Sequence, residues 1–184
     1  WVACRGGVVV LCLLGVWHLA LAPYHSFRLF NEIRFDGVAS NVKKAQVEAY
    51  FLKPQIYTLW PKLLLVSDLE QAVQNGDQPF SRAYVVTLIA LMRKEVVKDP
   101  GNIKARVALG RLYLMSDPVA AQAIFQRVAL NAPNKPHSYY YLGFAQQLNR
   151  QPRAAAASFR RCLDIDVKLI ECERLLRLLE GRGN

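Results

Sequence analysis

The chain has 184 residues, of which 53% are hydrophobic; this excludes a disordered segment and suits one modest domain with an accessory segment. The net charge of +10 is uneven: residues 23–79 carry six basic and six acidic side chains, whereas residues 80–184 carry seventeen and eight. Such a surface attracts acidic protein, anionic lipid or nucleic acid. Because no basic run exceeds two residues and none alternates with aromatic residues, we expect no specific nucleic-acid partner.

The N-terminal region contains an uncharged apolar run, residues 6–22, that ends before Pro23. A helix of that length is about 25 Å long, slightly less than the ~30 Å hydrocarbon core of a bilayer. We therefore predict a transmembrane helix or signal-anchor in residues 1–24, with 6–22 as the membrane contact. Two alternatives stay open: a signal peptide cleaved after Ala20-Leu21-Ala22, and the last span of a longer membrane protein, since the sequence begins at Trp1. Basic residues after the run favour a cytoplasmic C-terminal part, a topology that sequence upstream of Trp1 would change.

Residues 25–79 predict a helical linker. Helical spacing of apolar residues predicts helices at 27–33 and 41–52, and a third at 63–73. Between them, Trp60-Pro61 predicts a break, because a residue that precedes proline avoids the helical region of backbone space. The large aromatic residues of this region are expected to pack in a core or at a membrane interface.

From residue 80 onward the pattern becomes regular. Amphipathic helices are predicted at residues 80–98, 103–115, 119–130, 136–148, 153–165 and 168–180, separated by turns rich in proline, glycine and asparagine. The second and third helices resemble the fourth and fifth in sequence. Leu109-Gly110 recurs as Leu142-Gly143, Ala121-x₃-Phe125 as Ala155-x₃-Phe159, and Pro100 as Pro133, with shifts of 33 or 34 residues. Two helices in each period of this length indicate a helical repeat array.

These recurring positions resemble the tetratricopeptide repeat (TPR) superfamily. The resemblance implies an all-α fold: a TPR-like array of antiparallel helical hairpins, an α-solenoid, in residues 80–184. Its repeats span about 103–135 and 136–167, and a capping helix spans 168–180. In such an array, Phe125 and Phe159 fill the wedges between neighbouring hairpins, and no hairpin buries its apolar face alone. Arg106 and Val167 depart from the family pattern.

The same resemblance implies a partner-binding groove along the first helix of each repeat. The residues that the register assigns to it are Lys104, Arg111, Leu114, His137, Tyr140, Phe144 and Gln147. Cations beside aromatic rings suit an acidic or extended peptide from a protein partner. The set does not match the carboxylate-clamp pattern of chaperone-binding members. The alternative is a groove that is only solvated, or that is filled by residues 37–76.

Nothing in the sequence indicates catalysis. The three histidines are far apart, Cys162 and Cys172 are ten residues apart and match no zinc motif, and no phosphate loop or nucleophile motif occurs. The spacing of the two cysteines does not by itself indicate a disulfide. We therefore expect no catalytic, cofactor-binding or metal-binding residue, and a membrane-anchored protein-interaction or scaffold module.

A rival interpretation rests on the order of the segments. One span, a linker and then TPR units resembles the C-terminal end of O-antigen ligase-like or polymerase-like membrane glycosyltransferases. That resemblance implies a location in the bacterial inner membrane and catalytic residues in an upstream part that this chain lacks. A third interpretation is an assembly subunit that docks a complex through the array.

Overall fold

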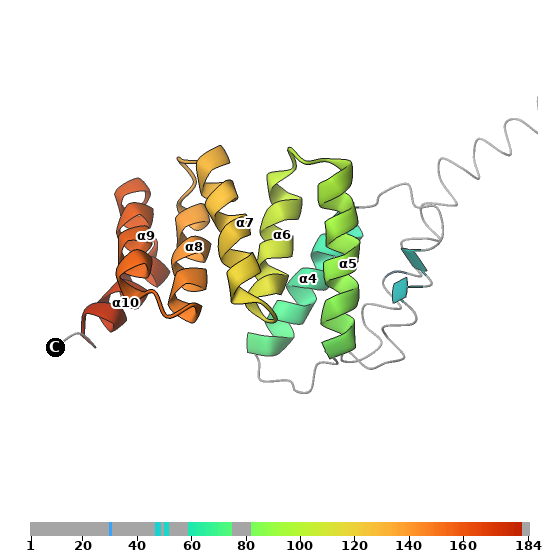
Figure 1. Ribbon diagram of the computed structural model, residues 1–184, viewed down its shortest axis with the longest axis horizontal. Helices are drawn as coiled ribbons and strands as arrows, with labels where there is room; N and C mark the ends of the chain where they lie inside the picture. The colour runs from blue at the N-terminus through green and yellow to red at the C-terminus, as the bar shows by residue number, and fades with distance from the viewer. Residues whose placement is uncertain (1–29, 31–46, 49, 52–58, 75–81, 182–184) are drawn as a thin grey trace, which may run out of the picture. The chain divides into compact units, whose positions relative to one another are not determined.

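The computed structural model describes Phe30, Val47, Glu48, Tyr50, Phe51 and residues 59–74 and 82–181 (Figure 1). These residues form helices and no strand, which confirms the all-α class. The chain divides into two compact units, Trp1–Thr87 and Leu88–Asn184. Within the described ranges, no helix has both the length and the apolar character that crossing a bilayer requires. The predicted membrane segment 6–22 and most of the predicted helices 27–33 and 41–52 lie outside those ranges.

In the first unit, helix α4 (Leu59–Gln74) buries Leu65, Val66 and Leu69. The prediction of a break at Trp60-Pro61 is wrong, because α4 begins before the proline. Pro61 lies in the first helical turn, where an N–H has no carbonyl partner in the helix and its loss has no cost. The pre-proline restriction is therefore satisfied at the start of a helix rather than between two helices.

Of the large aromatic residues in the first unit, Phe30 and Tyr50 are buried as predicted, whereas Trp60 is 52% exposed, contrary to the prediction. The ring centroids of Phe30 and Tyr50 are 5.6 Å apart, and Phe51 meets Tyr50 edge-on at 5.0 Å. The start of helix α5 (Arg82–Lys98) joins this unit, and Thr87 Oγ1 donates a 3.1 Å hydrogen bond to Glu48 Oε1. Burial, with a smaller effect from the Asp68 carboxylate, raises the pKa of Tyr84 well above its usual value.

The second unit contains the regular hairpins. They are built from α6 (Ile103–Leu114), α7 (Pro118–Asn131), α8 (Pro136–Leu148) and α9 (Pro152–Ile165), followed by α10 (Ile170–Glu180). Each helix packs against the next one in the chain, so neighbouring helices lie side by side in Figure 1. These bounds agree with the predicted helices within two residues, and the two predicted repeats correspond to α6–α7 and α8–α9.

Proline and short polar side chains explain where the helices of the second unit begin. Asn102 caps α6 by accepting a 3.1 Å hydrogen bond from the Ala105 N–H, and Asp117 caps α7 by accepting one of 3.0 Å from the Ala120 N–H. Pro118 and Pro152 are the first residues of α7 and α9, where the fixed φ of proline favours helix. The helices predicted from the sequence begin one residue later, at 119 and 153, with both prolines in the preceding turns.

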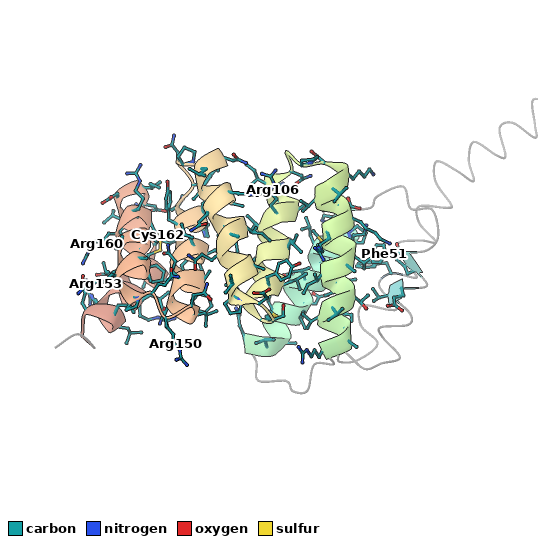
Figure 2. All side chains as sticks on the ribbon, viewed as in Figure 1. Phe51, Arg106, Arg150, Arg153, Arg160 and Cys162 are labelled. Carbon is teal, nitrogen blue, oxygen red and sulfur yellow. A yellow bond between two sulfur atoms is a disulfide. The ribbon has the colours of Figure 1, made fainter. Side chains whose placement is uncertain are left out.

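The turn between α8 and α9 is tied to the preceding hairpin. Asn149 Nδ2 donates hydrogen bonds to Pro118 O at 3.0 Å and to Gln122 Oε1 at 2.6 Å. Arg150 in this turn has φ = 59°, a left-handed conformation that glycine usually provides. Figure 2 shows that Arg153 and Arg160 project outward from α9, whereas Cys162 lies on its packed side.

The two hairpins meet at buried phenylalanine rings. Phe125 and Phe159 are both 0% exposed. Phe125 packs with Ala121 and Ala129 of its own helix and with Leu142 and Ala145 of the next hairpin. Phe159 packs with Ala155, Cys162 and Cys172. The predicted position of Phe125 between the two hairpins is confirmed, and Phe159 lies between the second hairpin and α10. Both rings remove a large apolar area from water.

Candidate partner-binding surface

The first helix of each hairpin carries a glycine against which the ring of the second helix packs. A Cβ atom on Gly110 would lie 2.6 Å from Cζ of Phe125, and one on Gly143 would lie 2.7 Å from Cε1 of Phe159. Both distances are far below van der Waals contact, so only glycine permits this approach. Because each glycine is the eighth residue of its helix, the contact fixes which faces of α6 and α8 point away from α7 and α9.

The same register extends to α10. Counting from Ile103, Pro136 and Ile170, the second residues of the three helices are Lys104, His137 and Glu171, and the fifth residues include Tyr140 and Arg174. We call the following residues the first-helix surface: Lys104, Arg111, Leu114, His137, Tyr140, Phe144, Gln147, Glu171 and Arg174. The first seven are those that the sequence predicted, and the last two are new.

Arg111 belongs to a stack that leads back to the core. Its guanidinium carbon lies 5.7 Å from the ring centroid of Tyr141, and that ring stacks on Phe125 at 5.2 Å with an interplanar angle of 16°. A cation above a ring face is attracted by the ring's electrons. The position of Arg111 is therefore coupled to the same phenylalanine that joins the hairpins, and Leu114 packs against that cluster too.

Tyr140 lies where three helices contribute charge. Burial raises the pKa of Tyr140, Glu171 raises it further, and Arg174 and Arg111 lower it. These opposing effects mean that side chains of α6 and α10 lie close enough to α8 to act on one hydroxyl. The Tyr140 ring also runs parallel to Phe144, with centroids 6.5 Å apart and 14° between the planes.

The remaining predicted residues are placed as follows. Lys104 and His137 are exposed in the first turns of α6 and α8, and Gln147 is half-buried near the end of α8. Gln147 Oε1 is a buried side-chain atom that accepts no hydrogen bond from any described residue. The structure thus brings Arg111, Tyr140 and Phe144 together, and keeps Lys104 and His137 at the entrance turns.

Sequence reasoning missed Tyr141, Glu171 and Arg174. The sequence did not single out Tyr141, because its neighbour Tyr140 is the residue that the repeat register assigns to the groove. In the structure, Tyr141 links Arg111 to Phe125. Glu171 and Arg174 were missed because α10 was treated only as a cap. The repeat period would have found them, since a further step of 34 residues from Pro136 leads to Ile170.

The described residues contain no group of three or more His, Cys, Asp or Glu side chains that could hold a metal ion. The first-helix surface instead combines aromatic faces with three cations, Lys104, Arg111 and Arg174, and one anion, Glu171. Such a surface can bind an anionic ligand by charge-assisted hydrogen bonds and ring contacts.

No protein-family model and no curated protein sequence matches the chain. Among solved structures, it is similar to the first TPR of Spaghetti (RPAP3) bound to the HSP90 peptide SRMEEVD, with a TM-score of 0.52, 15% identity, and coverage of 70% of this chain and 98% of that one. It is also similar to MamA MSR-1 C2, with a TM-score of 0.56, 16% identity, and coverage of 87% of this chain and 85% of that one.

Neither similarity supports the resemblance to O-antigen ligase-like proteins, which rested on segment order alone. Both neighbours share the overall fold of this chain, at 15% and 16% identity. Because the identities are low, the similarities concern the fold and not the ligand. The chain has the fold of a TPR-like α-solenoid.

Proposed function

We propose that the chain is a protein-interaction module whose first-helix surface binds an acidic, extended peptide segment of another protein. The observation that carries this proposal is that side chains of α6, α8 and α10 group together. They are Arg111, Tyr140, Phe144 and Arg174. Carboxylates of the partner would pair with the two arginines, and its apolar side chains would lie against the two rings.

The RPAP3 structure is a precedent for peptide binding by a protein of similar fold. That protein is solved with SRMEEVD, a peptide that contains three acidic residues. In the present chain, arginines beside aromatic rings would bind the acidic ligand.

A random 12-residue peptide library displayed on phage tests this function. The full chain is expected to retain peptides enriched in Asp and Glu, because the surface carries more cations than anions. Retained peptides with no acidic enrichment would contradict the proposal. The best retained peptide, labelled with a fluorophore, then serves as the probe for variants of the surface.

Charge reversal at Arg111 should raise the Kd of the labelled peptide by about tenfold or more. Hydrogen bonds to charged groups contribute about 1.5–3 kcal/mol, and each 1.4 kcal/mol is a factor of ten in Kd. Fluorescence anisotropy measures the effect of Arg111→Glu. The matched control is Arg127→Glu on α7, an exposed arginine outside the first-helix surface, which should change Kd less than about twofold by the same measure. Equal Kd values for the two variants would exclude the surface as the binding site.

A further inference from the structure

Helix α10 occupies the position of a first helix, but it lacks the glycine–phenylalanine contact that holds α6 and α8. In α6 and α8, the eighth residue is a glycine that receives the phenylalanine ring of a second helix. In α10 the eighth residue is Arg177, whose side chain is 75% exposed and pairs with Glu173.

A disulfide between Cys162 of α9 and Cys172 of α10 joins α10 to the array. Both cysteines are 0% exposed and belong to the cluster that contains Phe159. The side chains of Leu175, Leu176 and Leu179 on α10 also pack against this cluster, so the disulfide adds to an apolar contact. The Arg160–Glu180 ion pair, at 2.9 Å, is exposed on both sides, and solvent screens such pairs strongly.

The helix itself would not persist without these links. It has eleven residues, and isolated helices of that length are marginal in water. Two of its large apolar side chains, Ile170 at 71% and Leu178 at 53%, remain exposed, so it buries only part of its apolar surface. The covalent bond therefore adds to the apolar packing that keeps α10 in register on α9.

We propose that the Cys162–Cys172 disulfide is a redox-sensitive staple that holds Arg174 and Glu171 in the partner-binding surface, so that reduction releases α10 and weakens the binding of an acidic peptide. The part that concerns affinity rests on the proposed function. The part that concerns the release of α10 stands on the packing of α9 and α10 alone.

The chemistry is an ordinary thiol–disulfide exchange with a dithiol as the reductant. A thiolate of dithiothreitol attacks one sulfur, the S–S bond breaks, and the second thiol of the reagent displaces the remaining cysteine sulfur. The protein gains two electrons and two protons and ends with two thiols, while dithiothreitol closes to its cyclic disulfide. In an oxidising compartment the bond persists, and in a reducing one α10 is released.

Release of α10 affects the surface because of where Arg174 lies. Tyr140 packs against the cluster that contains Cys162 and Cys172, and the charges of Arg174 and Glu171 on α10 act on the pKa of its hydroxyl, as the charge of Arg111 on α6 does. Without α10 in place, the surface loses the Arg174 cation together with the Glu171 anion. A partner that pairs with both arginines then keeps only Arg111.

Two measurements on the full chain, with and without dithiothreitol, test the staple. Hydrogen exchange followed by mass spectrometry should show residues 170–180 exchanging at least about tenfold faster after reduction, with residues 103–148 unchanged. Anisotropy with fluorescein-labelled hexaglutamate should show about a tenfold loss of affinity. Unchanged exchange in residues 170–180 would overturn the staple.

A paired variant identifies the cause. Cys162→Ala with Cys172→Ala should behave like the reduced protein and should not respond to dithiothreitol. A response in that variant would assign the effect to another cysteine and overturn the proposal. In the oxidised protein, Arg174→Glu should weaken the binding of hexaglutamate without faster exchange in residues 170–180. Unchanged affinity would show that α10 is not part of the binding surface.

The outcomes separate this inference from the proposed function. If the oxidised chain does not bind hexaglutamate or any acidic library peptide, the proposed function is wrong and the affinity effect falls with it, while exchange in residues 170–180 still decides the staple. If binding is strong and indifferent to the disulfide, the function stands and the staple has no role in it.

Discussion

Replacing either Phe125 or Phe159 with alanine is expected to destabilise the array by about 3–5 kcal/mol, the usual range for a buried phenylalanine. Both rings are 0% exposed, and each fills the space between a hairpin and the helix that follows it. Because a domain of this size has a total stability of about 5–15 kcal/mol, either variant would lose a large part of its folding free energy. Urea unfolding, followed by helical circular dichroism, measures the change.

Leu130→Ala on α7 is the control for the phenylalanine variants. Leu130 is a large apolar residue that is 79% exposed, so its removal should change stability by less than about 0.5 kcal/mol. Phe125→Leu and Phe159→Leu should lose less than the alanine variants, because more of the volume stays filled. Alanine variants as stable as Leu130→Ala would mean that the rings do not join the hairpins.

Gly110→Ala and Gly143→Ala are expected to have the second large effect on stability. Each should destabilise the array, although helix propensity favours alanine over glycine. Alanine in a helix is usually about 1 kcal/mol more favourable than glycine. Here the new Cβ would lie 2.6 Å from the ring of Phe125, or 2.7 Å from that of Phe159, and the neighbour is a packed aromatic ring. Overpacking of this kind costs about 1–3 kcal/mol, so we expect a net loss in urea unfolding.

Two comparisons sharpen the glycine prediction. Gly101→Ala, in the turn before α6, places its Cβ 3.5 Å from Asp99 Oδ1, an ordinary contact, and should be close to neutral. Gly110→Ala combined with Phe125→Leu should lose less than the sum of the two single losses, because the smaller side chain leaves room for the methyl group. Additive losses would show that glycine and ring do not touch.

The hairpin array was predictable because its signals are local and repeated. The recurrence of Leu-Gly and Ala-x₃-Phe at one spacing identified both the helices and their partners, since glycine and phenylalanine are complementary in shape. Helix starts were predicted less accurately. Pro118 and Pro152 were assigned to turns, and Pro61 to a break, although proline is equally compatible with a first helical turn.

The candidate surface was predicted only in part. Repeat register gave Arg111, Tyr140 and Phe144, which the structure brings together. The disulfide could not be deduced, because a spacing of ten residues is compatible with several arrangements and only the packing of α10 on α9 brings Cys162 and Cys172 within bonding distance. The same packing decides that Glu171 and Arg174 belong to the surface.

The central claim is that the first helices, and not the second ones, bind an acidic peptide. Amide chemical shifts of the full, oxidised chain, recorded with increasing amounts of the best acidic library peptide, test it most directly. We expect the largest shifts in α6, α8 and α10, around Arg111, Tyr140 and Arg174. Shifts concentrated in α7 and α9, with the first-helix surface unchanged, would contradict it.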